Sequence, residues 1–210
     1  MPGNLFVTPD KKKRFLARAT RARRELRKEE TAGYIRDGSG NRYRVGVFFL
    51  LAGDVERAAD AFDWFEETFT DDVGEPIFFL YGALTAYRRG RLTKARVRLA
   101  NAMVSNIFLL PYLLRQGIDA TGVWLSSNWA DESYLAEMRD YLDGATQEDR
   151  AWIASEWNSA PFVTLREGYL STYRALNAER DLMRRRSLLT KWDLLQARQF
   201  AKLERQSSHA

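Results

Sequence analysis

The side chains whose spacing could support chemistry are carboxylates in the first half of the chain. Asp60, Asp63 and Glu67 follow one another at steps of three and four residues, which places them on one face of a helix. Such a group could act as a general acid and base or bind a hard cation through oxygen. The opposite face would carry the aromatic residues Phe62, Phe65 and Phe69. We therefore favour the simpler interpretation, in which the carboxylates solvate the outer face of an amphipathic helix.

Other residue types exclude most catalytic and metal-binding chemistry. The chain has no cysteine, which rules out disulfides, thiolate metal sites and cysteine nucleophiles. Its single histidine, His209, lies next to the C-terminus, so a histidine-dependent triad or a multi-histidine metal site is also excluded. Gly38-Ser39-Gly40 lacks the third glycine of a dinucleotide-binding loop and follows no predicted strand. We expect no catalytic residue, no metal site and no cofactor.

Cations are concentrated towards the two ends of the chain. Residues 11–28 hold ten cations and one acid, residues 174–205 hold nine cations and four acids, and residues 54–75 hold nine acids and one cation. The candidate polyanion-binding residues are Lys11, Lys12, Lys13, Arg14, Arg18, Arg21, Arg184, Arg185 and Arg186. Three interpretations stay open: contact with nucleic-acid phosphates, docking on the acidic stretch within or between chains, or solvated helix faces. Only Phe15 could add base stacking to the first basic segment.

Composition indicates a folded protein rather than a disordered one. The 210 residues are 45% hydrophobic and 13% aromatic, enough for one well-buried domain with appendages. The longest apolar stretches, residues 45–52 and 107–114, are too short to span a bilayer. The first six residues lack the pattern of a secretory signal. We expect a soluble, cytoplasmic protein that has no contact with a membrane.

A short internal repeat organises the first half of the chain. The stretch from Gly53 to Ala58 recurs in outline from Gly90 to Ala95, at a spacing of 90 − 53 = 37 residues. Each copy connects two apolar, helix-like runs, which predicts two stacked helical hairpins over residues 42–69 and 76–104. Small residues at the expected helix crossings would let the backbones approach closely.

These positions resemble the tetratricopeptide-repeat (TPR) family. The matching residues are Gly46, Gly53, Ala58 and Phe62 in the first hairpin, and Ala83, Gly90, Ala95, Leu99 and Ala102 in the second. The resemblance covers residues 42–114 and implies an all-α fold of TPR-like antiparallel hairpins in an α–α superhelix. The segment Asn106–Leu114 is similar to one that closes the repeats in uncharacterised bacterial TPR-like proteins.

The TPR resemblance also implies an inner surface formed by the first helix of each hairpin. Its candidate protein-binding residues are Tyr43, Val47, Leu50, Leu80, Leu84 and Tyr87. Tyr43, Val47 and Tyr81 stand where relatives that clamp a peptide carboxylate carry polar or basic residues, so the clamp is not implied. We favour an interpretation in which the chain's own Trp-rich C-terminal helices fill this surface. If they do not, an amphipathic helix is the expected ligand.

Four segments follow from these patterns. Residues 1–32 form a basic helical arm that begins at Thr8 and Pro9, with a thin stripe of Phe15, Ala19, Ala22 and Leu26. Residues 33–115 form the two hairpins. Residues 116–205 form a helical cap with helices near 131–142 and 147–157. From residue 161 the pattern is helical again, and this last helix is either continuous or broken near Arg184–Ser187. Residues 206–210 are expected to be a disordered tail.

We expect a non-catalytic protein–protein interaction scaffold or adaptor that binds a protein or peptide partner. The alternative is a nucleic-acid-associated protein that uses the basic N- and C-terminal helices. A stripe from Leu188 to Leu203 could pair two chains into a homodimer or fold back on its own chain.

Overall fold

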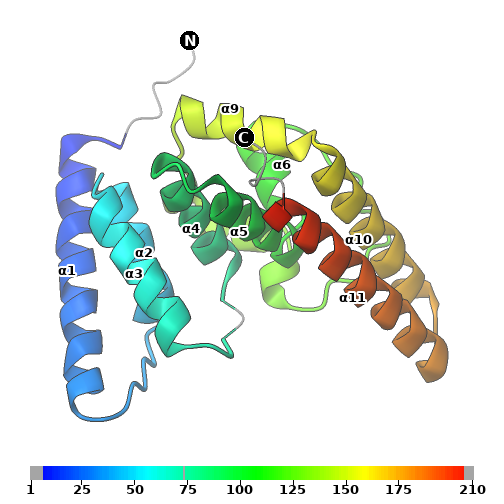
Figure 1. Ribbon diagram of the computed structural model, residues 1–210, viewed down its shortest axis with the longest axis horizontal. Coiled ribbons are helices and arrows are strands. Elements are labelled where there is room, and N and C mark those ends of the chain that lie inside the picture. The colour runs from blue at the N-terminus through cyan, green and yellow to red at the C-terminus, as the bar shows by residue number, and fades with distance from the viewer. Residues whose placement is uncertain (1–6, 73, 206–210) are drawn as a thin grey trace.

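A computed structural model describes residues 7–72 and 74–205, and the regular secondary structure of these residues is entirely helical (Figure 1). The helices are α1 (Pro9–Thr31), α2 (Asn41–Leu51), α3 (Val55–Thr68), α4 (Pro76–Arg88), α5 (Leu92–Ser105), α6 (Leu109–Leu114), the 3₁₀ turn η1 (Asn128–Ala130), α7 (Ser133–Glu137), α8 (Arg139–Leu142), α9 (Gln147–Trp157), α10 (Ala160–Ala178) and α11 (Leu182–Arg205). The expected tail and His209 lie outside the described residues. In the described part of the chain, no helix is both long enough and apolar enough to cross a membrane.

The basic N-terminal helix α1 forms as the sequence predicts. Thr8 is its N-cap, and the hydroxyl oxygen accepts a hydrogen bond from the Lys11 amide at 3.3 Å. The four residues of the thin apolar stripe are all buried. They pack α1 on α2, where the rings of Phe15 and Phe48 lie 6.0 Å apart. The stripe therefore docks the arm on the first hairpin.

The two predicted hairpins are present and lie side by side. Helix α2 packs on α3, α4 packs on α5, and α2 and α3 both contact α4. The close crossing of α2 and α3 depends on Gly46, because a Cβ atom there would lie 2.9 Å from the Phe62 ring. In the second hairpin Ala83, Ala95 and Ala102 are fully buried.

The same turn joins the helices of each hairpin. Gly53 and Gly90 have φ angles of +89° and +71°, a region that glycine enters without steric cost. The backbone hydrogen bonds around them recur at the same positions: Asp54 N to Phe49 O and Arg91 N to Ala86 O, both at 2.9 Å. The spacing of thirty-seven residues in the sequence is thus a spacing of equivalent turns in the fold.

The helix expected over residues 131–142 is wrong in detail, because two short helices, α7 and α8, occupy this segment. Met138 separates them with φ −92° and ψ 4°. Polar groups of the segment bond to α4 rather than along a continuous helix. The Tyr134 hydroxyl accepts from the Ile77 amide at 3.2 Å, and the Tyr141 carbonyl accepts from the Tyr81 hydroxyl.

The C-terminal helical region is broken, but at residues 179–181 rather than at Arg184–Ser187. Glu179 is extended, and its carboxylate accepts from the amides of Arg180 and Asp181. Asp181 then accepts from the Arg184 amide at 2.9 Å, as an N-cap residue does. The break leaves Met183 71% exposed at the start of α11.

Helix α11 folds back along α10 and reaches α5 (Figure 1). Trp192, Gln199 and Leu203, which belong to the stripe from Leu188 to Leu203, are buried in these contacts. The stripe that could have paired two chains is therefore used largely within one chain.

Candidate functional site

The candidate groove on the inner side of the hairpins is filled. Val47, Leu50, Leu80 and Leu84 are at most 3% exposed, so they are core residues rather than lining of an open surface. Tyr87 is half-buried and stacks on Trp152 of α9, with ring centroids 4.5 Å apart. The chain's own C-terminal elements close this side, which is the interpretation that the sequence favoured. These five residues offer no binding groove here.

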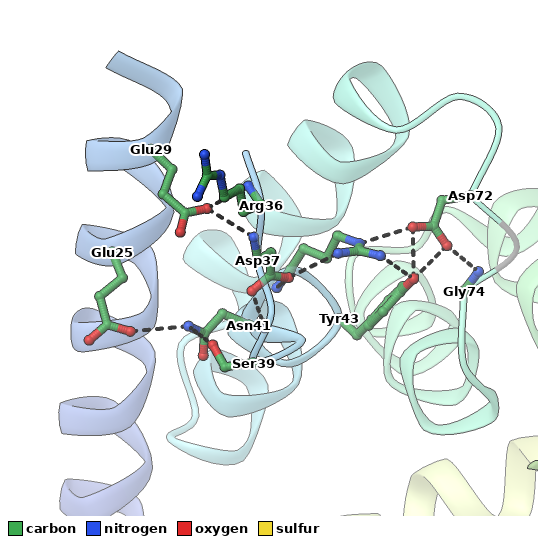
Figure 2. Close-up of polar contacts among 10 residues, drawn as sticks. Glu25, Glu29, Arg36, Asp37, Ser39, Asn41, Tyr43, Asp72 and Gly74 are labelled. Carbon is green, nitrogen blue, oxygen red and sulfur yellow. Dashed lines mark hydrogen bonds and ion pairs between the residues drawn. The ribbon is translucent and has the colours of Figure 1, made fainter. Parts of the chain in front are cut away.

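Tyr43, the sixth groove candidate, belongs to a polar network that Figure 2 shows. Its hydroxyl donates to the Asp72 carboxylate at 2.7 Å, and Arg42 Nε donates to the same carboxylate at 2.9 Å. Asp37 accepts from the Arg42 amide at 2.8 Å, and Glu29 of α1 accepts from the Asp37 amide at 3.0 Å. The network ties α1, the loop before α2 and the α3–α4 connection to one another.

The electrostatics of this network favour a structural role over a reactive one. Burial and the hydrogen bond to Asp72 raise the pKa of Tyr43, although Arg42 acts in the opposite direction. Burial alone would raise the pKa of Asp72, but the hydrogen bonds from Gly74, Tyr43 and Arg42 lower it. A protonated phenol beside an ionised, fully bonded carboxylate is a stable pair at neutral pH.

The acidic residues singled out for chemistry are engaged with cations of the second hairpin. Asp63 pairs with Lys94 at 2.7 Å and with Arg91 at 3.3 Å. Burial tends to raise the pKa of Asp63, but the Lys94 hydrogen bond and the neighbouring charges lower it overall. Asp60 and Glu67 are exposed. Among the described residues, no group of three or more His, Cys, Asp or Glu side chains is placed to hold a metal ion.

The acidic stretch is neutralised mostly by cations outside the basic arms. Its ion-pair partners include Arg42, Arg44, Arg89, Arg91, Lys94 and Arg98. Contact with α1 includes its C-terminal half, where Trp64 Nε1 donates to Glu30 at 3.2 Å and the Arg23 guanidinium lies 4.6 Å from the Trp64 ring. Among the described residues, the arm touches this stretch but forms no ion pair with it.

The candidate polyanion residues of α1 divide into free and engaged side chains. The side chains of Lys11, Lys12, Lys13 and Arg14 are exposed and make no hydrogen bond or ion pair with any described residue. Arg18 donates to the Tyr141 hydroxyl at 3.2 Å and lies over the Phe48 ring at 4.4 Å. Arg21 pairs with Glu25 at 2.9 Å.

The second basic cluster offers fewer free cations and lies far from the first. Arg185 is half-buried, and its Nη1 donates to the carbonyls of Leu176 and Glu179, so it closes the end of α10 instead of facing a ligand. Arg184 and Arg186 are exposed, and Arg184 makes only a 3.8 Å contact with Glu179. Figure 1 shows α1 and the α10–α11 connection at opposite ends of the long axis of the molecule. The two clusters therefore do not form one continuous basic surface.

A cleft of about 570 Å³ between α1 and the first hairpin is lined mainly by cations. Five of its lining side chains are cations, namely Arg23, Arg24, Arg27, Lys28 and Arg57, and none is acidic. The candidate residues chosen from the sequence include none of these five.

Part of this cleft could have been found from the sequence. Thr20, Arg24, Arg27 and Thr31 also line it, and their steps of four, three and four residues define one helix face. No local pattern predicts that Arg57, the single cation of the acidic stretch, faces them from α3.

The comparisons with known proteins add no relative: no family model, no curated protein and no solved structure matches the chain.

Proposed function

We propose that this chain is a non-catalytic protein–protein interaction scaffold of the TPR-like type. The equivalent turns at Gly53 and Gly90 and the stacking of α2–α3 on α4–α5 support the assignment to TPR-like hairpins. The inner side of these hairpins is filled, so the partner binds elsewhere. The outer face of α1 is the surface that fits this role.

One observation carries the proposal. Lys11, Lys12, Lys13 and Arg14 stand exposed and unpaired with respect to the described residues, on a helix held by a buried stripe at one end of the hairpin stack (Figure 1). A rigid helix with four exposed cations that lack a partner among the described residues is suited to bind an acidic segment of another protein. Complementary charge of this kind speeds association and selects the partner.

Nucleic acid is the second candidate, because the same exposed cations could neutralise phosphates. Two features weigh against it. The two basic clusters lie at opposite ends of the molecule, and Phe15, the one aromatic residue of the segment, is 7% exposed and unavailable for stacking.

The experiment compares two variants that each lose three cations. K11Q/K13Q/R14Q alters the N-terminal half of α1, and R184Q/R186Q/K191Q alters exposed cations of α11. Proteins captured from the source cells by the wild type are identified, purified and titrated against all three forms by calorimetry. We expect a partner whose affinity falls in the α1 variant and persists in the α11 variant. Equal affinity for all three forms would contradict the proposal, and capture that nuclease abolishes would favour nucleic acid.

A further inference from the structure

The cationic cleft is shaped by three helices, not by one charged helix face. Arg24, Arg27 and Lys28 enter it from α1, Phe49 of α2 is part of its wall, and Arg57 enters from α3. Residues from α1 and α3 are far apart in the sequence, so the cleft exists only in the folded chain.

Aromatic rings fix two of its arginines in place. The Arg23 guanidinium lies 4.6 Å from the Trp64 ring, and the Arg57 guanidinium lies 4.9 Å from the Phe49 ring. Arg57 is held further by Asp54, whose carboxylate it contacts at 2.6 Å. Guanidinium groups that are held in this way lose little conformational entropy when they bind an anion.

The carboxylates of α1 that could neutralise the cleft form hydrogen bonds or ion pairs with other groups. Glu25 binds Arg21 and the Asn41 amide group, Glu29 accepts from the backbone amide of Asp37, and Glu30 accepts from Trp64 (Figure 2 shows the first two carboxylates). The cleft therefore keeps its positive charge.

Apart from Arg57, which pairs with Asp54, the cations of the cleft lack ion-pair partners among the described residues. The side chains of Arg24, Arg27 and Lys28 form no hydrogen bond or ion pair with any described residue, and Arg23 Nη1 is buried without a hydrogen-bond partner there. Burial lowers the pKa of Arg23, and the charge of Arg27 lowers it further, although Glu30 and Asp60 oppose them. Like charges gathered in this way repel one another, and an anion would relieve the repulsion.

We propose that this cleft binds the phosphoryl group of a phosphorylated serine or threonine within the acidic segment of a protein partner. The inference rests on the proposed function and names the chemistry of its partner. A phosphoryl group carries a charge of about −1.5 to −2 at neutral pH and offers three strong acceptor oxygens. Arg24, Arg27 and Lys28 would supply donors from α1, and Arg57 would supply a guanidinium fork from the opposite wall.

The surroundings of the cleft favour a protein segment over other phosphate sources. The three α1 cations are exposed, so solvent screens their attraction and a free phosphate ion would bind weakly. A tethered phosphoryl group gains the neighbouring contacts of its segment with the rest of α1. Among the lining residues the only aromatic side chain, Phe49, is 5% exposed, so the cleft gives a nucleic-acid base nothing to stack on.

The test measures discrimination between two forms of one peptide by fluorescence anisotropy on the full chain. The labelled peptide carries two phosphoserines among aspartate and glycine residues, and its twin carries unmodified serines. We expect the wild type to prefer the phosphorylated form by about tenfold or more. R24Q/R27Q/K28Q should abolish this preference. The matched variant K11Q/K13Q/R14Q should weaken both forms by a similar factor and keep the preference.

The outcomes separate this inference from the proposed function. The phosphoryl site would be overturned if both variants lost the preference for the phosphorylated peptide, or if the wild type showed none. Binding of the unmodified acidic peptide would still support the proposed scaffold function in that case. No binding of either peptide would count against both. A single-stranded oligonucleotide of equal charge that displaces the phosphopeptide at equal concentration would assign the cleft to nucleic acid instead. Circular dichroism of each variant confirms that it is folded.

Discussion

The ring of Tyr87 on α4 stacks on the ring of Trp152 on α9, with centroids 4.5 Å apart and planes only 9° from parallel. Tyr87 is one of the residues that were expected from the sequence to line an inner binding surface of the hairpins. Offset stacking of aromatic rings adds stability beyond the apolar area that it buries. The C-terminal region is therefore an integral part of the core of the hairpins.

Replacing Trp152 tests how strongly that closure stabilises the fold. Trp152→Ala removes a side chain that is 8% exposed and leaves a cavity beside Tyr87. We expect the free energy of unfolding to fall by about 3–5 kcal/mol. Urea denaturation followed by circular dichroism measures the loss. Trp129, which is 41% exposed, provides the control, and an equal loss in Trp129→Ala would show that stacking in the groove is not the cause.

An ion pair between Arg88 and Asp149 also joins α4 and α9. The Asp149 carboxylate is buried, accepts from Arg88 Nε at 3.1 Å and completes the capping box of α9 by accepting from the Thr146 amide at 2.7 Å. Asp149→Ala removes both functions and leaves Arg88 partly buried without its partner. We expect a loss of about 3–5 kcal/mol in the free energy of unfolding.

The neighbouring exposed residue gives the control for this prediction. Glu148→Ala removes one carboxylate from the same first turn of α9 without breaking a side-chain contact among the described residues. It should cost at most about 0.5 kcal/mol. Comparable thermal denaturation midpoints for the two variants would contradict the role assigned to Asp149.

Local patterns predicted the elements that depend on local interactions. The cap at Thr8 and the turns at Gly53 and Gly90 each involve residues within five positions of one another, so the sequence displays them directly. The buried stripe of α1 follows equally from helical spacing. This is why the hairpins and the N-terminal arm were predicted nearly to the residue.

The missed features depend on groups brought together from distant segments. The residues near Met138 do not indicate that the Tyr141 carbonyl accepts a hydrogen bond from the Tyr81 hydroxyl of α4. This contact is found in the segment where two short helices replace the single predicted helix. Likewise, the role of Arg185 at the end of α10 depends on the break at residues 179–181. The cationic cleft needs Arg57 from α3 opposite α1, a pairing that helical periodicity does not encode.

The crossing of α2 and α3 should be sensitive to a single methyl group. Gly46→Ala would place a Cβ atom 2.9 Å from the Phe62 ring, in a core position with no room to yield. We expect a loss of about 1–3 kcal/mol from overpacking. Gly117→Ala is the control, because Gly117 has a negative φ and open space around its Cβ position. Denaturant midpoints should shift for the first variant alone, and an unchanged midpoint in Gly46→Ala would refute the close crossing.

Glu75 should make the stability of the fold depend on pH. Its side chain is buried, Oε1 has no hydrogen-bond partner among the described residues, and Arg44 lies 3.6 Å away. Burial raises the pKa of Glu75 above its ordinary value of 4.5, and Arg44 only partly offsets this effect. The folded state then binds the proton more tightly than the unfolded state. Stability contributed by this carboxyl is therefore present at low pH and lost as pH rises through the folded-state pKa.

A neutral amide at position 75 measures that contribution. Glu75→Gln should raise the free energy of unfolding near neutral pH, and the gain should shrink as pH falls towards 4.5. Urea denaturation over this range gives the difference between variant and wild type. A difference that does not change with pH would show that Glu75 does not titrate in this way. Arg44 and Tyr134, which both interact with Glu75, are unchanged in both proteins.

The cationic cleft should lower the stability of the unliganded protein. The cleft is lined by five cations, namely Arg23, Arg24, Arg27, Lys28 and Arg57. Three of them, Arg24, Arg27 and Lys28, form no ion pair with a described residue. Removing these three like charges therefore relieves repulsion without breaking an ion pair. We expect R24Q/R27Q/K28Q to unfold at an equal or higher temperature than the wild type at low salt, with a gain of about 0.5 kcal/mol or more that added salt erases. Scanning calorimetry at two salt concentrations measures both effects.

If the three cations stabilise the fold through contacts of their own, the variant will instead melt at a lower temperature under both conditions. In that case the cleft would contribute to the stability of the fold and would not be a site kept open for an anion.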